Sequence, residues 1–443
     1  MSLRDFEAEF NLKRTNNLSE LMPNNWKKYK LNDIAEIVMG QSPSGDSCTN
    51  NPSDGLPLLN GPTEFGYSYP TPVQYTKDSR KKSEVGDLLF CVRGSTTGKM
   101  NFSNKVYSIG RGIAAIRGKN SYPTKFVKYL IDMHLPQMLN VTTGSTFPNI
   151  GKDDLNNVSV EVPDSNTAIA IAEILSSLDD KIESNLQTNK TLEEMANALY
   201  KHWFVDFGPF KDGKFVESEL GLIPEGWDIG VLGDLVNFYN GYGFKSGDLL
   251  DDNIGDCYHV FKMGHIKKGG GLKSDGTRSF VQKSKCNKLE NFILKKGDLL
   301  MSMTDMKDKV SILGHTAIMD EDDKYIVNQR VGLLRAKKEL GIDYPYLYIL
   351  SNSVPFLNDL RSRANSGVQV NLSTEGIKNT TVLIAPKIIH EEFNKIVLSL
   401  FEKTFENAKE NQTLTQTRDY LLPKLISGEV RVKDAEKTVK EMI

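Results

Sequence analysis

The segment of this chain that comes nearest to a site for chemistry spans residues 93–100, RGSTTGKM, which is close to a phosphate-binding loop. In such a loop, spaced glycines let backbone N–H groups surround the phosphates, and a Ser or Thr after the lysine holds Mg²⁺. Here Arg93 occupies the place of the first glycine, and Met100 follows Lys99. The segment therefore does not predict a nucleotide site.

Other patterns that carry catalysis or bind metals are also missing from the sequence. No GxGxxG opens a predicted helix, and neither HExxH nor GxSxG occurs. The cysteines form no CxxC pair. Metal-ligand spacing is also absent among the isolated histidines His134, His202, His265, His315 and His390. The acidic run at 320–323 is typical of a solvated loop. We therefore expect no catalytic or metal centre, although dispersed nuclease carboxylates would leave no local pattern.

Length and composition indicate a globular protein of two or three domains. The chain has 443 residues, of which 39% are hydrophobic and 25% charged, and its net charge is −2. No run approaches the roughly 18 apolar residues of a membrane span. The polar first residues and the scattered cysteines predict a cytoplasmic protein. The chain is not basic overall, but lysines cluster between residues 262 and 296, and local fields matter more than the sum.

The chain repeats itself, and the repeat fixes its architecture. The offset between the copies grows from 201 to 211, 218 and then 222 along four pairs of segments: 21–26 with 222–227, 85–89 with 296–300, 109–117 with 327–335, and 122–123 with 344–345. The second copy therefore carries about twenty extra residues, and we expect them in loops, where insertions are tolerated.

Each copy begins with short apolar runs broken by Gly, Pro, Asn and Ser, and ends in a long helical pattern. The runs predict strands in the segments DLLFCVRG, GIAAIR and VSVEVP of copy one and DLLMSM, VGLLRA and TVLIAP of copy two. A helix is also expected within each mixed segment, near residues 126–139 and 346–360.

The two long helical segments show a heptad seam, with apolar residues spaced alternately by four and three. In the first the seam is Ile171, Leu175, Leu178, Ile182, Asn185, Asn189, Leu192, Ala196 and Leu199. In the second it is Phe393, Val397, Leu400, Thr404, Asn407, Asn411, Leu414, Arg418 and Leu421. Both seams carry asparagine at the same two positions, and a buried asparagine fixes register at a cost in stability.

Antiparallel pairing of the two helices gives the better layers. With Asn185 opposite Asn411, large apolar residues face one another, and the one poor layer sets Leu178 against Arg418. This arrangement predicts an antiparallel coiled coil with the two domains at its opposite ends, related by a pseudo-two-fold axis. Two amphipathic helices packed separately on their own domains are the alternative.

The predicted fold class is α/β (α+β), with two similar domains separated by two long helices. The expected segments are an N-terminal extension (1–20), a first domain (21–165), a central helical spacer (166–208), a second domain (217–387), a C-terminal helical spacer (388–430) and a tail (431–443).

This order of domain, helix, domain and helix resembles the specificity subunits of type I restriction-modification systems. The resemblance rests on residues 170–207, 220–236 and 414–432, and on the shorter segments Gly40-Gln41-Ser42-Pro43 and 144–150. It covers nearly the whole chain, and its most specific part is the helix and junction from 170 to 236.

The resemblance implies a non-catalytic protein that binds double-stranded DNA. Each domain, a target-recognition domain, would bind one half of an asymmetric, interrupted sequence, and the helices would act as spacer and docking surface. The implied partners are two methyltransferase subunits and two restriction-motor subunits, which would hold S-adenosylmethionine, ATP and Mg²⁺, so that this chain binds no cofactor. A free docking surface also makes self-association of the isolated chain plausible.

Residues that contact DNA are expected in the polar, turn-rich segments that recur in both copies. Base edges are recognised by Arg, Lys, Asn, Gln, Ser and Thr, and phosphates by cations and backbone amides. The candidates in copy one are Gln41, Ser42, Arg93, Ser95, Thr97, Lys99, Arg111, Thr143, Ser145, Thr146 and Asn149. Those in copy two are Lys245, Lys262, Lys267, Lys268, Ser302, Thr304, Gln329, Arg330, Ser366, Gln369 and Asn371.

Two other functions remain compatible with the residues alone. One is a scaffold of two mixed domains on a coiled-coil strut, which sequence-specific DNA binding would distinguish. The other is a stand-alone nuclease, which metal-dependent cleavage by the purified chain would support.

Overall fold

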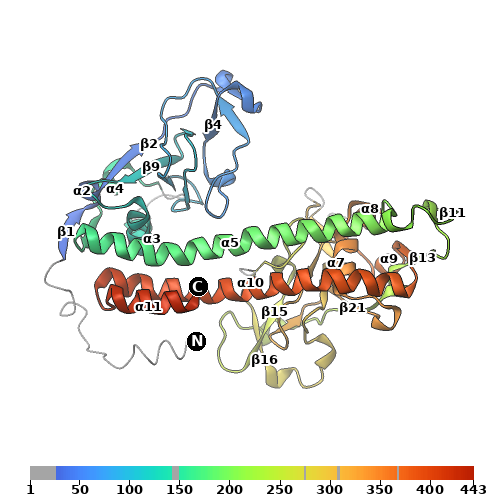
Figure 1. Ribbon diagram of the computed structural model, residues 1–443. Coiled ribbons are helices and arrows are strands. Elements are labelled where there is room, and N and C mark those ends of the chain that lie inside the picture. The colour runs from blue at the N-terminus through green and yellow to red at the C-terminus, as the bar shows by residue number, and fades with distance from the viewer. Residues whose placement is uncertain (1–25, 142–148, 274–275, 307–309, 367–368) are drawn as a thin grey trace. The chain divides into compact units, whose positions relative to one another are not determined.

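The computed structural model describes residues 26–141, 149–273, 276–306, 310–366 and 369–443 of the chain (Figure 1). The chain divides into two compact units. The first combines residues 1–187 with 407–443, and the second is the continuous stretch 188–406. The first unit is therefore built from both ends of the chain. The predicted N-terminal extension lies outside the described residues.

The first unit contains two four-stranded sheets and a two-stranded ribbon. One sheet is antiparallel, in the order β2 (Ala35–Met39), β9 (Ile113–Gly118), β6 (Leu88–Cys91) and β7 (Met100–Phe102). The other has the order β3 (Cys48–Thr49), β5 (Gln74–Thr76), β4 (Leu56–Leu59) and β8 (Ser108–Ile109), with β4 and β8 parallel. The ribbon pairs β1 (Lys27–Lys30) with β10 (Ser159–Val162). Three of the unit's shorter helices are α2 (Leu31–Ile34), α3 (Thr124–Val141) and α4 (Lys152–Asn156).

The sequence of strand β6 is apolar at every position because both faces of the strand are buried. Successive side chains of a strand point to opposite faces of the sheet. Leu88 and Phe90 accordingly enter the cluster shared with α3, whereas Leu89 and Cys91 enter a separate cluster with Tyr107. All these residues are fully buried. The sheet is covered on both faces, which removes the polar alternation expected of a half-exposed strand.

The second unit repeats this plan with added strands. Its main antiparallel sheet has the order β14 (Val236–Asn240), β21 (Val331–Ala336), β17 (Leu299–Ser302) and β19 (Thr316–Ile318). A second sheet has the order β16 (Phe280–Gln282), β15 (Cys257–Phe261) and β20 (Tyr325–Val327), and a third has the order β18 (Thr304–Met306), β23 (Gln369–Asn371) and β22 (Asn365–Ser366). Two-stranded pairs join β11 (Phe215–Ser218) to β12 (Gly221–Pro224) and β13 (Asp228–Val231) to β24 (Thr381–Ile384). Two of its short helices are α6 (Leu232–Leu235) and α9 (Thr374–Lys378).

The predicted strands are confirmed in both copies. In β17 the burial alternates as it does in β6: Leu299 belongs to the cluster shared with the helices, and Leu300 belongs to the cluster beneath the second sheet. The two domains are thus similar in sheet order and in the faces that their strands bury.

A Gly-Asp turn leads into the central strand of each domain. Gly86 and Gly297 have φ values of 89° and 87°, in the left-handed region that favours glycine. The Asp87 carboxylate accepts hydrogen bonds from the Glu84 N–H at 2.7 Å and from the Arg117 guanidinium at 2.9 Å. In the second domain Asp298 accepts equivalent bonds from the Lys295 N–H and the Arg335 guanidinium, both at 2.9 Å. The recurring Gly-Asp motif is therefore structural.

The helix expected near residues 346–360 is divided into two. Helix α7 (Tyr344–Asn352) ends before Ser353, and α8 (Val354–Ser362) begins immediately after it. Pro355 lies in the first turn of α8. A proline cannot donate a helical hydrogen bond, and its ring clashes with the carbonyl group four residues earlier, here that of Ser351, so one continuous helix would be strained there. The corresponding helix of the first domain, α3, contains Pro136 in its interior and continues past it.

Two long helices contribute to both units: α5 (Ser165–Phe204) and α10 (Lys387–Ser427). In the first unit they pair antiparallel, because Asp179 contacts Arg418 whereas Asn185, further along α5, contacts the earlier residue Asn411. The Asn185 side-chain amide donates to the Asn411 side-chain oxygen at 2.9 Å. Seam residues Leu175 and Leu421 share one buried cluster. The predicted register is confirmed here.

The same antiparallel pairing holds within the second unit. The Asn189 amide donates to the Thr404 carbonyl oxygen at 3.3 Å, and the Tyr200 ring lies 6.3 Å from the Phe393 ring. Ala196 and Val397 are fully buried in the seam. The helices therefore pack as the heptad pattern predicts, rather than separately on their own domains.

The layer that sets Leu178 against Arg418, which is unfavourable in the predicted register, is stabilised by a side chain outside the seam. Leu178 is fully buried, and Arg418 turns its guanidinium to Asp179, at 2.6 Å. Asp179 also accepts a hydrogen bond from the Tyr129 hydroxyl of α3, at 2.6 Å. Although burial opposes ionisation, the cations Lys128 and Arg418 hold the pKa of Asp179 below its usual value. A charged cluster thus joins the first domain to both long helices.

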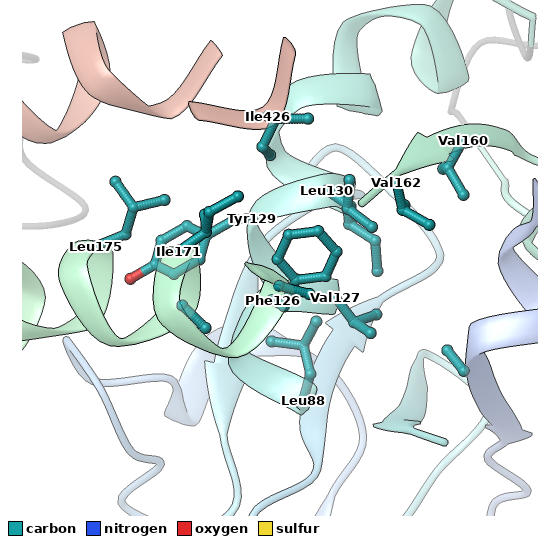
Figure 2. Packing of buried hydrophobic residues seen from close by; sticks show 14 of the residues in the cluster. Leu88, Phe126, Val127, Tyr129, Leu130, Val160, Val162, Ile171, Leu175 and Ile426 are labelled. Atoms are coloured by element: carbon teal, nitrogen blue, oxygen red, sulfur yellow. The ribbon is translucent and has the colours of Figure 1, made fainter. Parts of the chain in front are cut away.

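The core of the first domain is completed by residues from the far end of the chain. Figure 2 shows Ile426 of α10 above Leu130 of α3, in the cluster that also contains Leu88 and Leu175. The final helix, α11 (Val432–Met442), adds Ala435 and Val439 to the same cluster. The first domain therefore has no complete core without α10 and α11.

We expect Arg418→Leu to lower the free energy of unfolding by about 3 kcal/mol, because it leaves Asp179 largely buried without its closest cation. The double variant Asp179→Leu/Arg418→Leu should recover most of this loss, since no charge then remains unpaired. Urea unfolding followed by circular dichroism measures both. Equal losses in the single and double variants would contradict the assignment.

We expect the stability of the second unit to fall as the pH drops from about 6.5 towards 4. The His390 ring is 1% exposed between Phe204 and Tyr346, and among the described residues neither of its nitrogens has a hydrogen-bond partner. Burial lowers the pKa of His390 to about 4, so the unfolded chain takes up the proton first. The contribution is intact above about pH 6.5, and about 3 kcal/mol is lost across the interval.

Thermal unfolding of the wild type and of His390→Phe across this pH range provides the test. The variant should show a smaller pH dependence, while keeping the part due to His265, whose pKa burial also lowers to about 4. An unchanged pH slope would show that His390 does not contribute.

Candidate nucleic-acid interface

In each domain several candidate residues gather at one loop junction, and the backbone of this junction is the same in both copies. In the first domain, the Gly40 N–H donates to the Ile113 carbonyl oxygen at 2.9 Å and the Gln41 N–H to the Ile109 carbonyl oxygen at 2.9 Å. In the second domain, the equivalent bonds join Gly241 to Val331 at 3.1 Å and Tyr242 to Val327 at 3.0 Å. We call these segments, 40–42 with 109–113 and 241–243 with 327–331, the loop junctions.

A further chain segment closes each junction from the side. The Ile150 N–H donates to the Val92 carbonyl oxygen at 3.0 Å, and Arg93 and Asn149 form an antiparallel bridge. In the second domain the Leu372 N–H donates to the Met303 carbonyl oxygen at 2.9 Å, and Thr304 pairs with Asn371. The sequence repeat is therefore also a repeat of backbone hydrogen bonds.

In the first domain the junction brings together candidates that are distant in sequence. Gln41, Ser42, Arg93, Arg111 and Asn149 are all exposed there. The Ser42 hydroxyl oxygen accepts the Arg111 backbone N–H at 3.2 Å, which ties the two loops together. These five residues form a polar surface of the kind that base and phosphate contacts require.

The remaining first-domain candidates lie on the turn between β6 and β7 or outside the described residues. Ser95 and Lys99 are exposed on the turn, whereas the Thr97 hydroxyl donates to the Gly94 carbonyl oxygen at 2.8 Å. Thr143, Ser145 and Thr146 lie outside the described residues.

In the second domain the junction presents Gln329 and Arg330, both exposed. Gln369 and Asn371 are half-buried on the adjoining strand β23, which pairs with β22, where Ser366 lies. Lys245 is exposed in the loop that follows β14.

Two second-domain candidates are corrected by their burial. The Ser302 side chain is fully buried, and its hydroxyl donates to the Thr304 carbonyl oxygen at 3.2 Å. Thr304 is 8% exposed, and its hydroxyl lies 2.8 Å from the Met263 sulfur. Both hydroxyls are used inside the protein, so the structure removes these residues from the predicted contact set.

The lysine and glycine turn is anchored to other elements. Lys267 and Lys268 are exposed, but the Gly271 N–H donates to the Thr316 carbonyl oxygen of β19 at 2.9 Å. A side chain added at Gly270 would meet Asn352 of α7. These contacts hold the turn against β19 and α7.

Comparison of the two copies in the sequence did not select Asn60. It did select Lys262, which is the structural counterpart of Asn60 in the second domain. The Gly110 N–H donates to the Leu59 carbonyl oxygen at 2.8 Å, and the Asn328 N–H donates to the Phe261 carbonyl oxygen at 3.0 Å, so Asn60 and Lys262 follow equivalent residues. Asn60 contributes to an open hollow of about 440 Å³, which Ser42, Pro43, Gly45, Cys48 and Arg111 also line. Counting the offset of 202 from Lys262 would have found it.

Two groups among the described arginines differ in their partners. Arg117, Arg335 and Arg418 are partly buried and paired with aspartates. Arg93, Arg111 and Arg330 are exposed, and no acceptor within the described residues contacts their guanidinium groups. Cations that the fold does not use are available for phosphates and base edges.

Fold and interface together define a protein of two repeated recognition domains. Within the residues that the structure describes, no three His, Cys, Asp or Glu side chains are placed to share a metal ion. The four cysteines are free. None of the described helices combines the length and the apolar character needed to cross a membrane.

The family model for the type I restriction modification DNA specificity domain matches the chain twice, at residues 23–194 and 224–416. The chain belongs to this family and is a specificity subunit of a type I restriction-modification system, with two DNA target-recognition domains. The predicted family and fold class are confirmed.

Relatives of similar length support this assignment. The chain is 26% identical over 437 residues to the type I restriction enzyme MjaIX specificity subunit of Methanocaldococcus jannaschii, covering 93% of this chain and 95% of that protein. It is 28% identical over 362 residues to the HindI specificity subunit of Haemophilus influenzae, covering 66% and 74%. The crystal structure of the type I S subunit from M. genitalium shares the fold, with a TM-score of 0.56 and 19% identity over 94% of this chain and 98% of that one.

We expect Arg93→Ala or Arg330→Ala to weaken binding of the specific DNA by about 1–3 kcal/mol if that residue contacts a base. Fluorescence anisotropy with specific and scrambled duplexes at fixed salt measures the change. Arg363→Ala is the matched control, because Arg363 is also exposed but already paired with Asp359. Unchanged affinity and sequence preference in both variants would remove these arginines from the interface.

Proposed function

We propose that this chain binds an asymmetric, interrupted DNA sequence, with one half bound by each domain. The observation that carries the proposal is the pair of loop junctions, which share one backbone arrangement and differ in the side chains exposed on it. A common frame supports a common way of approaching DNA, and different side chains support different half-sites.

In this proposal the chain supplies sequence recognition and leaves catalysis to its partners. Two methyltransferase subunits would hold S-adenosylmethionine and methylate adenine. Two restriction-motor subunits would hold ATP and Mg²⁺. The complex would act on DNA in the cytoplasm.

The long helices are the proposed docking surface for the methyltransferase subunits. Beyond the buried seam they expose apolar side chains, at Ile169, Leu186 and Met195 of α5 and at Ile388 and Ile396 of α10. Exposed apolar residues on helices whose seam is already filled are suited to contact further helices.

Sequencing of methylated adenine in DNA from cells that express this chain with its methyltransferase subunit tests the proposal. We expect a single two-part methylated motif. Exchange of residues 20–165 for those of a relative with another target should change one half of the motif only. A soluble, assembled complex that methylates no defined motif would overturn the proposal.

A further inference from the structure

The residue at the tip of each loop junction is Arg111 in the first domain and Gln329 in the second. These two residues carry different side chains on an equivalent backbone. Arg111 follows Gly110, whose N–H donates to Leu59, and Gln329 follows Asn328, whose N–H donates to Phe261. The residue after each tip accepts a backbone hydrogen bond in the same way, Gly112 from Val92 at 2.9 Å and Arg330 from Met303 at 3.2 Å. Arg111 and Gln329 are therefore counterparts in space, as the sequence offset of 218 indicates.

The backbone of each tip is held by close contacts. A Cβ atom added to Gly110 would lie 2.2 Å from the Asn60 side-chain oxygen, and one added to Gly112 would lie 2.3 Å from the Asn60 carbonyl oxygen. The Arg111 N–H is bound by Ser42, and the Gln329 N–H donates to the Tyr242 carbonyl oxygen at 3.0 Å. A side chain on such a fixed tip has a defined origin, as a specific base contact requires.

The two tip side chains themselves are not used by the fold. Both are exposed, and neither the Arg111 guanidinium nor the Gln329 amide forms a hydrogen bond or ion pair within the described residues. Arg111 borders the hollow that Ser42 and Asn60 also line. Each tip thus pairs a fixed backbone with an unoccupied hydrogen-bonding group.

Arginine and glutamine favour different bases in the major groove. Arginine donates two hydrogen bonds to O6 and N7 of guanine, whereas glutamine bonds both N6 and N7 of adenine. We propose that Arg111 specifies a guanine in the half-site bound by the first domain, and that Gln329 specifies an adenine at the corresponding place in the other half-site. This inference rests on the proposed function and adds the base that each domain selects.

The test uses the full chain, co-expressed with its methyltransferase subunit, and the methylated motif as the measurement. The wild-type motif should contain a fixed guanine in one half and a fixed adenine in the other. Arg111→Gln should replace that guanine by adenine or lose the preference at this position, and Gln329→Arg should do the reverse in the other half. The discrimination between the two bases should change by about tenfold or more.

Two further variants separate base selection from structural damage. Arg111→Lys should keep the guanine, because lysine also binds guanine O6 and N7. Arg80→Gln should leave the motif unchanged, because Arg80 is also exposed in the first domain but is paired with Asp78. Thermal unfolding and recovery of the intact complex show that each variant is folded.

The outcomes distinguish this inference from the proposed function. A two-part wild-type motif that stays the same in Arg111→Gln and Gln329→Arg overturns the inference and leaves the function standing. Uniformly weaker methylation with no change of base also overturns it, because it shows contacts to phosphate. The absence of any motif in the wild type is a failure of the proposed function itself.

Discussion

The structure depends on the antiparallel register of α5 and α10 within each unit. A buried amide must find a partner inside the seam, and Asn185 finds Asn411 only in one register. A shift of one heptad would separate the two amides and set Asn411 against an apolar seam residue, Leu178 or Leu192, without that bond. The same register brings Arg418 to Asp179, and through Asp179 to Tyr129 of the first domain. One alignment of two helices therefore also positions the domain that packs on them.

The sequence predicts the features that appear as regular residue spacing. It does not predict contacts between side chains that are distant in the sequence. The strands, the repeat and the seam follow from spacing alone. The break in the second domain's helix does not, because Pro355 falls in a segment expected to be one helix, whereas Pro136 leaves α3 continuous. The contact of Asp179 with Arg418 was not predicted, because Asp179 lies beside the seam rather than in it. Ser302 was misplaced although the offset of 211 pairs it with Cys91, which is buried in β6. Thr304 pairs with the exposed Arg93, and that pairing says nothing of the Met263 sulfur that meets Thr304.

The loop junctions show how one frame can carry different recognition. Apart from the Ser42 hydroxyl that accepts the Arg111 N–H, their hydrogen bonds join backbone to backbone, so the tip residues can be exchanged without loss of a structural side chain. The arginines that the fold needs, such as Arg117 and Arg335, are held at the Gly-Asp turns instead. Separation of structural from exposed cations leaves the interface free to vary while the core does not.

The sharing of α10 and α11 sets the order in which the protein can fold during synthesis. The second unit is one continuous stretch, 188–406, whereas the first includes residues 407–443. Domains usually complete their folding in the order in which they leave the ribosome. Here the first domain emerges early but waits, with Phe126 and Leu130 lacking their partner Ile426, until the last helix is released. The domain that is translated second is thus the first that can close, and the nascent first domain is the part that most needs protection from aggregation.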